Sequence, residues 1–375
     1  TDPYSHFLLY GLRLREREVQ ELTPIESGNF YHDALDLISR QLLRLNKDLS
    51  TVTEAELNSI SKDIFDQLLA TNKYRLSQSS NRMRFIFKQL TKTVRNQVWA
   101  MINQAKRSKF RTNKTELVFG QLGDQQDVRG LSFDLQGNRK LHLRGKVDRI
   151  DTFVDNNQLY AGIVDYKSSQ TTFNYQSLYH GLMLQMITYL DTVLTFSKDI
   201  FDQEALGIGA FYSTVNDYFI DLQDLKNKDL HLERLKNYKL DGLIVDRMEV
   251  LNAADTALNP SEHSPLFNLY LKKDGSYSNK KILTEEEFRL LLRYNREKII
   301  EAGNRIISGE NTLHPFNKRN FKVFTPSVDG PYRAISQFDA LLPENNYQDI
   351  NKIDKDDFFD YLKEKYSDKQ KEDKN

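Results

Sequence analysis

The chain has 375 residues, of which 39% are hydrophobic and 28% are charged. This composition is typical of a soluble globular protein, excludes a chain that is disordered throughout, and suggests about two domains. The sequence contains no cysteine, which excludes disulfides, thiolate-bound zinc, iron–sulfur clusters and cysteine nucleophiles, and which fits a cytoplasmic location. The N-terminal residues do not resemble a secretory signal, and no apolar run is long enough to cross a bilayer, so we expect no membrane association.

The 53 basic and 53 acidic residues cancel, so a nucleic-acid partner would have to be recognised by a local patch of charge. Such a patch is present at residues 73–114, which include twelve Lys and Arg and no Asp or Glu. Apolar residues from Met83 to Ala105 recur at helical spacing, which predicts a long basic amphipathic helix. The candidate DNA-binding residues in this segment are Arg82, Arg84, Lys88, Lys92, Arg95, Lys106 and Arg107.

A surface that binds phosphate groups is one interpretation of this basic segment. A solvated helix face that happens to lack acids is the second interpretation. A role at a membrane surface is disfavoured, because the apolar face of the helix suits a protein core.

The predicted elements change character along the chain. Patterning predicts helices over most of 30–108, short strands over 115–167, a long helix over about 176–196, and strands at 207–214 and 243–251. Thr284 and Glu287 form a capping box at the start of a further helix that ends near Gly309.

This order of elements predicts one elaborated α/β domain over residues 1–350, with helices wrapped around it. Its expected parts are a helical segment of about 1–114, a core of about 115–223 and an accessory segment of about 224–350. The remaining residues, 351–375, are dense in Lys, Asp and Glu and are expected to form a charged tail, in which Phe358, Phe359 and Leu362 could dock and the last ten residues are loose.

The residues with the clearest chemistry lie in a predicted β-hairpin. The sequence GKVDRID at 145–151 leads through a turn at 155–157 into GIVDYK at 162–167. Asp165 and Lys167 are two residues apart on the second strand, so their side chains project from one face of the sheet. Asp148 lies on the first strand and can come opposite them.

Two carboxylates and one ammonium that meet at a sheet edge suit the hydrolysis of a phosphodiester. Carboxylate oxygens hold Mg²⁺, and the metal polarises the phosphoryl oxygen and lowers the pKa of a bound water. Lys167 can orient that water or stabilise the developing negative charge. The alternative is a hairpin with exposed charges that form surface ion pairs.

These segments resemble the PD-(D/E)XK core of the RecB-type nucleases. More narrowly, the chain up to about residue 351 resembles the C-terminal part of the AddB/RexB subunits of bacterial AddAB/RexAB helicase–nucleases. The segments that carry this resemblance are HFLLYGLRL (6–14), GNFYHDAL (28–35), GKVDRID (145–151), IVDYKSS (163–169), QMITYL (185–190), SQFD (336–339) and LPENNY (342–347). The resemblance implies a restriction-endonuclease-like α/β fold with a mixed central sheet and extensive flanking helices.

The resemblance also implies roles for the residues of the hairpin. Asp148 and Asp165 match metal ligands of the family, and the backbone carbonyl of Tyr166 is expected as a further ligand. Lys167 matches the catalytic lysine of the family.

Four residues outside the hairpin match family positions as well. His32 matches a histidine that reaches the metal from an N-terminal helix, and the alternative for it is a histidine hydrogen-bonded within the core. Gln185 and Tyr189 lie one helical turn apart, as in the family's Gln-x-x-x-Tyr motif, where they support the lysine or contact a phosphate. Tyr189 could equally be a plain core residue. Glu116 falls where the family often has an acidic residue, and a solvent-facing strand position would explain it equally well.

The implied activity is that of a Mg²⁺-dependent exonuclease, with Mn²⁺ as an alternative metal, that acts on single-stranded DNA from an unwound duplex. The implied setting is repair of double-strand breaks by homologous recombination in the bacterial cytoplasm, with the 5′-ended strand as substrate. The implied partner is an AddA/RexA-type helicase–nuclease subunit in a heterodimer. The alternative is a catalytically silent nuclease fold that binds DNA and acts as a scaffold for the partner.

The chain departs from the family at four positions. Most AddB-type subunits bind a 4Fe–4S cluster through four cysteines, and here the matching positions are held by Asp2, Ser327, Gly330 and Ser336. We therefore expect no cluster. We expect the two ends of the domain to be joined instead by ordinary packing around four aromatic residues, namely Phe7, Tyr10, Tyr332 and Phe338.

Overall fold

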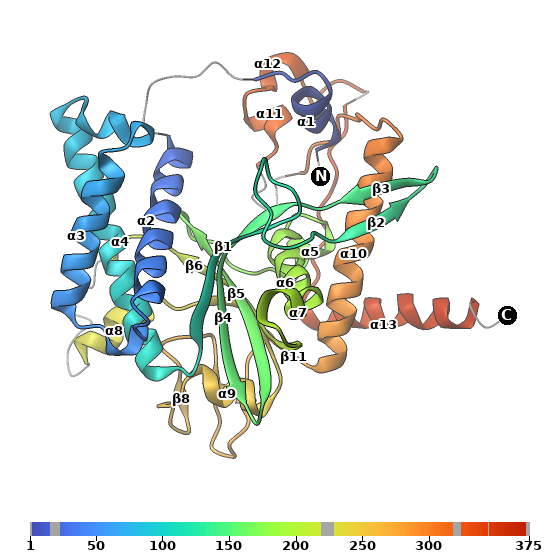
Figure 1. The fold of residues 1–375 in the computed structure, drawn as a ribbon. Helices are drawn as coiled ribbons and strands as arrows, with labels where there is room; N and C mark the ends of the chain where they lie inside the picture. Colours follow the sequence, from blue (N-terminus) through green and yellow to red (C-terminus); the bar gives the residue numbers. More distant parts are fainter. Residues whose placement is uncertain (1, 16–22, 219–228, 318–323, 344, 373–375) are drawn as a thin grey trace.

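The computed structural model describes residues 2–15, 23–218, 229–317, 324–343 and 345–372. In this part of the chain, a six-stranded sheet has helices on both of its faces (Figure 1). In spatial order its strands are β1 (Arg111–Phe119), β4 (Gly145–Asp155), β5 (Gln158–Lys167), β6 (Ala205–Thr214), β7 (Asp241–Val245) and β11 (Ile282–Leu283).

The sheet is mixed. β1, β4 and β5 pair antiparallel, β5 and β6 pair parallel, β6 and β7 antiparallel, and β7 and β11 parallel. The predicted hairpin is confirmed as β4 and β5. Its two turn residues, Asn156 and Asn157, both have positive φ, as the tight turn between twisted strands requires.

The parallel pair of β5 and β6 needs a crossover connection, which helices on one face of the sheet provide. These helices are α5 (Tyr175–Tyr179), α6 (Gln185–Thr195) and α7 (Ser197–Phe201). The prediction of one long helix over 176–196 is therefore wrong. Gly181 has a left-handed φ of 71° between α5 and α6, where the chain leaves the helical conformation.

Three helices that precede the sheet in sequence form a bundle beside it (Figure 1). They are α2 (Pro24–Arg44), α3 (Glu54–Leu69) and α4 (Asn81–Arg107), with short 3₁₀ helices η2 (Leu49–Thr51) and η3 (Asn72–Gln78) between them. Thr23 and Thr53 cap α2 and α3 through capping boxes, which satisfy backbone N–H groups at the helix ends. The rings of Phe30, Tyr74 and Phe87 meet edge to face in the core of the bundle. Helix α4 confirms the predicted basic amphipathic helix.

The face of the sheet that carries α5, α6 and α7 is also covered by α10 (Glu285–Ile307) and α13 (Lys355–Glu372). Thr284 and Glu287 cap α10 as expected. Although 351–375 is rich in charge, α13 buries Phe358, Phe359 and Leu362 almost completely in the core beneath the sheet. The boundaries suggested for the parts of the domain stay a prediction.

Smaller elements complete the described part of the chain. They are β2 (Ser132–Leu135), β3 (Arg139–His142), α8 (Leu230–Lys236), α9 (Met248–Ala254), β8 (Glu262–His263), β9 (Tyr270–Leu271) and β10 (Tyr277–Ser278). Among the residues that the structure describes, no helix is both long enough and apolar enough to cross a membrane.

The two ends of the domain meet in a terminal module made of α1 (Pro3–His6), the π-helix η1 (Phe7–Gly11), α11 (Pro326–Asp329) and α12 (Arg333–Ser336). The carboxylate of Asp2 accepts a hydrogen bond from the backbone N–H of Ser327 at 3.1 Å. Tyr332 is buried and donates to the carbonyl of Leu14 at 3.4 Å, as expected for packing between the ends.

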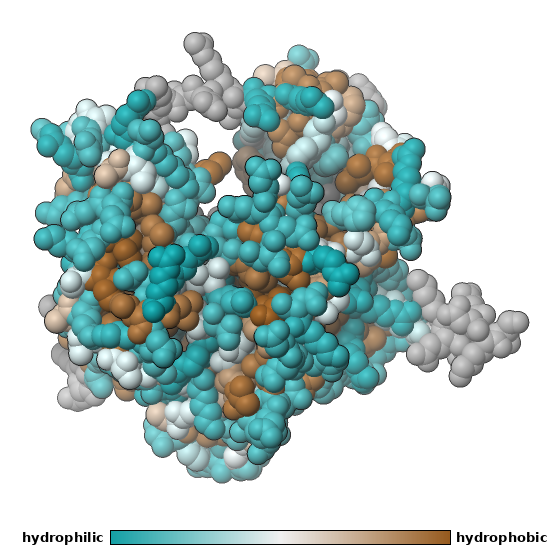
Figure 2. Space-filling model, viewed as in Figure 1, coloured by the Kyte–Doolittle hydropathy of each residue, from teal (hydrophilic) through white to brown (hydrophobic). Residues whose placement is uncertain are grey.

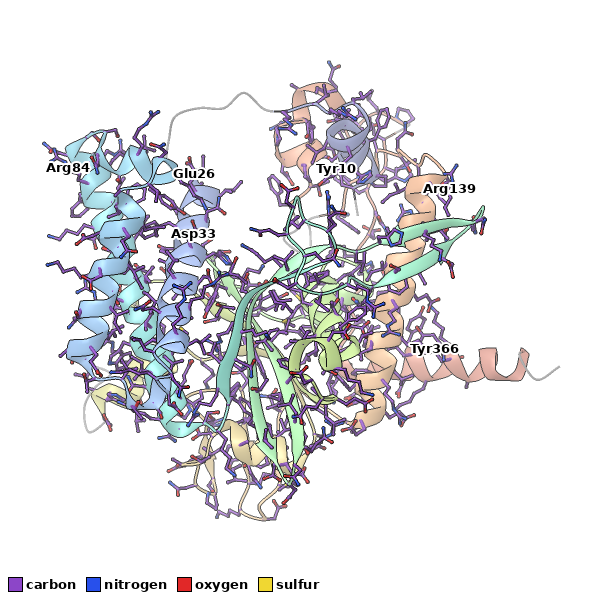
Figure 3. The ribbon with its side chains drawn as sticks, viewed as in Figure 1. Tyr10, Glu26, Asp33, Arg84, Arg139 and Tyr366 are labelled. Atoms are coloured by element: carbon purple, nitrogen blue, oxygen red, sulfur yellow. The ribbon has the colours of Figure 1, made fainter. Side chains whose placement is uncertain are left out.

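The expectation for Tyr10 is wrong, because its side chain is 68% exposed and lies on the outside of the terminal module (Figure 3). The ring of Phe338 contacts that of Tyr347. The hydrogen bond between Asp2 and Ser327 thus joins the two ends of the domain, a role that the sequence analysis had assigned to aromatic packing alone. Apolar surface remains visible on the module in Figure 2.

Candidate active site

The candidate site lies where β4 and β5 separate. The two strands pair from Arg149 opposite Val164 to the hairpin turn, and Asp148 and Asp165 are the next residues along each strand. Beyond this point β4 continues beside β1 alone, and β5 continues beside β6 alone. Each aspartate is therefore at a fork in the sheet, with backbone groups around it that are not used by the β4–β5 ladder.

Asp148 is 7% exposed and is held from two directions. Its Oδ2 accepts a hydrogen bond from the backbone N–H of Tyr166 at 2.8 Å. Its Oδ1 lies 3.3 Å from Nδ1 of His32, which projects from α2. Burial lowers the pKa of His32, but the hydrogen bond to Asp148 and the charges of Asp148 and Asp165 outweigh burial, so the pKa is raised. The structure thus brings His32 to the hairpin, as the sequence analysis expected.

Glu116 also reaches this point, from β1. The pairing of β1 with β4 places it opposite Asp148, between the pairs Thr115–Arg149 and Leu117–Val147. Its φ is 52°, which is unusual for a residue with a side chain and costs on the order of 1–3 kcal/mol. Its carboxylate forms an ion pair with Lys146 of β4. Glu116 is therefore directed into the site rather than into solvent.

Asp165 and Lys167 form the second part of the site. Asp165 is 4% exposed, and its Oδ2 lies 2.6 Å from Nζ of Lys167. Burial and the nearby charge of Asp148 raise the pKa of Asp165, while Lys167 lowers it. The carboxylate is thus buried beside another carboxylate with one ammonium as its compensating charge.

Helix α6 supports Lys167 from the other side. Oε1 of Gln185 lies 3.4 Å from Nζ of Lys167, and Nε2 of Gln185 donates to the hydroxyl of Tyr189 at 2.9 Å. The ring of Tyr189 packs edge to face on Phe119. The structure thus brings Gln185 to Lys167 and Tyr189 to Gln185, and the roles that the family motif implies for them stay a prediction.

A buried arginine supports the site from behind. Arg149 donates to the hydroxyl of Tyr166 at 3.2 Å and to the carboxylate of Asp151 at 2.8 Å. Tyr166 in turn holds Asp148 through its backbone N–H. Arg149 therefore fixes the residue that orients Asp148, without reaching the site itself.

The donor groups fit a divalent cation. Ligand atoms of His32, Glu116 and Asp148 all lie within 4.8 Å of one another. Asp165 is outside this group of three, and its buried Oδ2 is compensated by the ammonium of Lys167 while the charge of Asp148 lies nearby. Two carboxylates buried beside each other are costly, and a divalent cation would offset their charge.

A family model described as the PD-(D/E)XK nuclease superfamily matches residues 2–318. The chain belongs to this superfamily. Nucleases of the PD-(D/E)XK superfamily use divalent metals, in agreement with the donor set described above. The mixed α/β fold expected from the sequence is confirmed, as is the resemblance to these nucleases.

Several curated proteins that are named as a subunit of an ATP-dependent helicase/deoxyribonuclease are similar to this PD-(D/E)XK chain. The protein from Enterococcus faecalis is 36% identical over 359 residues, which cover 94% of this chain and 30% of that protein. Those from Latilactobacillus sakei and Desulforamulus reducens are 36% and 30% identical and cover 97% and 98% of this chain. The chain spans 30–31% of the length of these relatives.

The basic residues on α4 do not form one uniform surface. Lys92 is paired with Asp217 at 2.9 Å, and Arg107 is paired with Asp255 at 3.1 Å. The exposed members of the set are Arg82, Arg84, Lys88, Lys92, Arg95 and Lys106. Lys92 and Arg107 each have an acidic partner within the fold. The candidate DNA-binding residues named from the sequence therefore include both residues that form ion pairs within the fold and residues that do not.

Lys146 and Arg149 were missed as site residues by the sequence analysis. Lys146 is two residues before Asp148 on the same strand, so its proximity to the site could have been inferred from the motif. The contact of Arg149 with Tyr166 gave no signal, because it depends on which way the ring turns behind the sheet.

Proposed function

We propose that this chain is a divalent-metal-dependent deoxyribonuclease domain that hydrolyses phosphodiester bonds of single-stranded DNA. The observation that carries the proposal is the meeting of Asp148, Asp165 and Lys167 at the fork between β4 and β5. A silent module would have no use for two carboxylates buried beside each other, of which that of Asp165 has the ammonium of Lys167 as its compensating charge.

The metal ligands in this proposal are Asp148 and Asp165, with the backbone carbonyl of Tyr166, His32 and Glu116 beside them. A divalent cation, Mg²⁺ or Mn²⁺, supplies polarisation of the phosphoryl oxygen and a lowered pKa for a water when it is bound. The carboxylate oxygens are donors that both ions accept.

Lys167 would act on the substrate directly. Its ammonium can donate to the attacking water or to the phosphate oxygen that gains negative charge. Asp165 and Gln185 limit the orientations of the ammonium by binding it from two sides. The amide of Gln185 is itself fixed by Tyr189, so the oxygen of the amide faces the lysine.

The relatives named as helicase/deoxyribonuclease subunits support a larger setting for this activity. We propose that the domain works with an AddA/RexA-type helicase–nuclease partner, in the bacterial cytoplasm, on a strand that the helicase has unwound. The 5′-ended strand is the expected substrate, and repair of double-strand breaks by homologous recombination is the expected process.

The test is degradation of end-labelled single-stranded DNA by the purified complex, with the nuclease of the partner disabled. We expect cleavage with Mg²⁺, none with EDTA, and a loss on the order of 10²–10³-fold or more in Asp165→Asn and in Lys167→Met. Asp134→Asn is a matched control, because Asp134 is an exposed aspartate on the separate β2–β3 hairpin. Cleavage that persists in both site variants would move the chemistry elsewhere, and DNA binding without cleavage in the wild type would favour the silent scaffold.

A further inference from the structure

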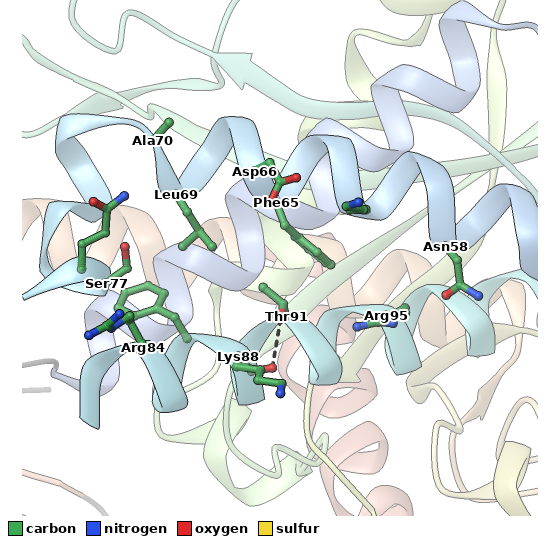
Figure 4. A pocket seen from close by; sticks show the side chains of 13 residues that line it. Asn58, Phe65, Asp66, Leu69, Ala70, Ser77, Arg84, Lys88, Thr91 and Arg95 are labelled. Atoms are coloured by element: carbon green, nitrogen blue, oxygen red, sulfur yellow. Dashed lines mark hydrogen bonds between the residues drawn. The ribbon is translucent and has the colours of Figure 1, made fainter. Parts of the chain in front are cut away.

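A groove with a volume of about 680 Å³ lies between α3 and α4 (Figure 4). Four cations line it, Lys62 from α3 and three residues from α4, against one acid, Asp66. The three cations from α4 are Arg84, Lys88 and Arg95.

Among the residues that the structure describes, these cations have few partners. The side-chain cations of Lys62, Lys88 and Arg95 form no ion pair or hydrogen bond there, and that of Arg84 donates to the neutral amide of Asn81. Lys92 and Arg107, on the same helix, do have acidic partners. The groove therefore brings together four basic side chains that have no acidic partner among the described residues.

The three cations on α4 follow the groove. They are four and seven residues apart, which at 1.5 Å per residue spreads them over roughly 16 Å. Neutral polar side chains that could donate to or accept from a sugar–phosphate chain also line the groove, namely Asn58, Ser77, Gln78 and Thr91. A row of unpaired cations beside such groups suits a polyanion whose charges are regularly spaced.

The floor of the groove argues against an amphipathic protein helix as the occupant. Its two aromatic residues, Phe65 and Phe87, are only 6% and 2% exposed, because they belong to the core of the bundle. A helix that docks in a groove needs exposed apolar pockets for its anchor residues. These two rings therefore provide no such pockets, and the remaining apolar lining comes from Leu69 and Ala70.

The 3₁₀ helix η3 connects the groove with the candidate active site. At its start, Lys73 and Tyr74 bind the carboxylate of Asp33, the residue after His32. At its end, Gln78 lines the groove. Five positions separate Lys73 from Gln78, and the backbone bends at Tyr74, where φ is −111° and ψ is 22°. Figure 3 shows Asp33 on α2 and Arg84 on the side of the bundle away from the sheet.

We propose that the α3–α4 groove binds the phosphate backbone of the single-stranded DNA whose end is cleaved at the β4–β5 fork, with the strand passing over η3. The inference rests on the proposed function for the identity of the strand. The proposal adds Lys62 to the candidate DNA-binding residues. It gives Lys92 and Arg107 a structural role instead, through their ion pairs with Asp217 and Asp255. A strand too short to extend past η3 gains nothing from the groove.

The test is the affinity of the purified protein for oligo(dT) of about 5 and about 25 nucleotides, measured in EDTA so that no metal-dependent cleavage occurs. The groove variant combines Lys62→Gln, Lys88→Gln and Arg95→Gln. The matched control combines three exposed lysines on other elements, namely Lys140→Gln, Lys272→Gln and Lys273→Gln. Thermal unfolding of both variants verifies that they are folded.

We expect the wild type and the control to bind the long oligonucleotide more tightly than the short one, and the groove variant to lose most of this gain. Removal of three phosphate contacts lowers the slope of log affinity against log salt by about 2, and lowers the affinity for the long oligonucleotide on the order of 10- to 100-fold. Equal weakening for both lengths, or no weakening relative to the control, would overturn the proposal. Normal DNA binding with failed assembly of the heterodimer would also overturn it and would assign the groove to an acidic protein partner. Because binding is measured without cleavage, a protein that binds DNA in the groove but never cuts would contradict only the proposed function.

Discussion

Replacing Gly145 with alanine tests how the site is packed. Gly145 begins β4, and a Cβ added there would lie 2.6 Å from Cζ of Phe119 and 3.1 Å from Cε1 of Tyr189. Ordinary contacts of a Cβ begin at 3.4 Å, so the ring of Phe119 must yield by about 0.8 Å. This ring is 1% exposed and is part of the core beneath the sheet. We therefore expect Gly145→Ala to lower the free energy of unfolding by about 1–3 kcal/mol, the usual cost of overpacking.

The same substitution should reduce cleavage. Displacement of Tyr189 weakens its hydrogen bond with Gln185, and Gln185 then no longer fixes the ammonium of Lys167. A misplacement of about 1 Å near a reacting group can cost about 100-fold in rate, so we expect kcat to fall roughly 10- to 100-fold.

The assays for Gly145→Ala are thermal unfolding and cleavage of single-stranded DNA. The matched control is Gly28→Ala on α2, where the added Cβ would be 3.8 Å from Oγ of Ser168 and would meet no obstacle. Alanine should stabilise that helix by roughly 0.5–1 kcal/mol. If Gly145→Ala had the same free energy of unfolding and the same cleavage rate as the wild type, the close packing of Gly145 against Phe119 and Tyr189 would be refuted.

Three further predictions concern the metal site, the C-terminal helix and the terminal module. Lys146→Gln should lower the Kd for Mg²⁺ several-fold in calorimetry, because the ammonium of Lys146 competes with the cation for the carboxylate of Glu116. The effect should vanish when Glu116 is also replaced by Gln. A higher Kd for Mg²⁺ in Lys146→Gln would contradict this competition. Leu362→Ala should lower the free energy of unfolding by about 2–5 kcal/mol, because the side chain is fully buried, whereas a loose tail would show no change in the unfolding midpoint. Asp2→Ala removes the acceptor for the backbone N–H of Ser327, so amide hydrogen exchange in α11 should accelerate while exchange in β5 is unchanged; protection of α11 as in the wild type would show that the contact is dispensable.

The hairpin and the long basic helix could be predicted from sequence because their signals are local. Asn156 and Asn157 accept the positive φ of the turn, and alternation or helical spacing of apolar residues defines each element over many positions. The break between α5 and α6 was missed because a single glycine within an apolar pattern does not reveal a left-handed conformation. Local pattern thus identifies long elements better than it identifies interruptions.

The candidate site was predictable to the extent that it follows a motif. Asp148, Asp165 and Lys167 share one hairpin, so their meeting follows from strand geometry. The ion pair of Lys146 with Glu116 and the row formed by Lys62 with the cations of α4 depend on how separate segments pack. Such contacts cannot be predicted from local sequence patterns, because the residues around one partner do not indicate which distant segment will pack against it.

The hydrogen bond of Asp2 with Ser327 joins residues that are 325 positions apart. At a ribosomal rate of about 5–20 residues per second, the partner of the first helix emerges on the order of tens of seconds after that helix. During this interval α1 and η1 have no docking surface, although Leu8 is 2% exposed once the module is formed. The earliest part of the domain to be synthesised is therefore among the last to be completed, and its apolar residues must be kept from wrong contacts until α11 arrives.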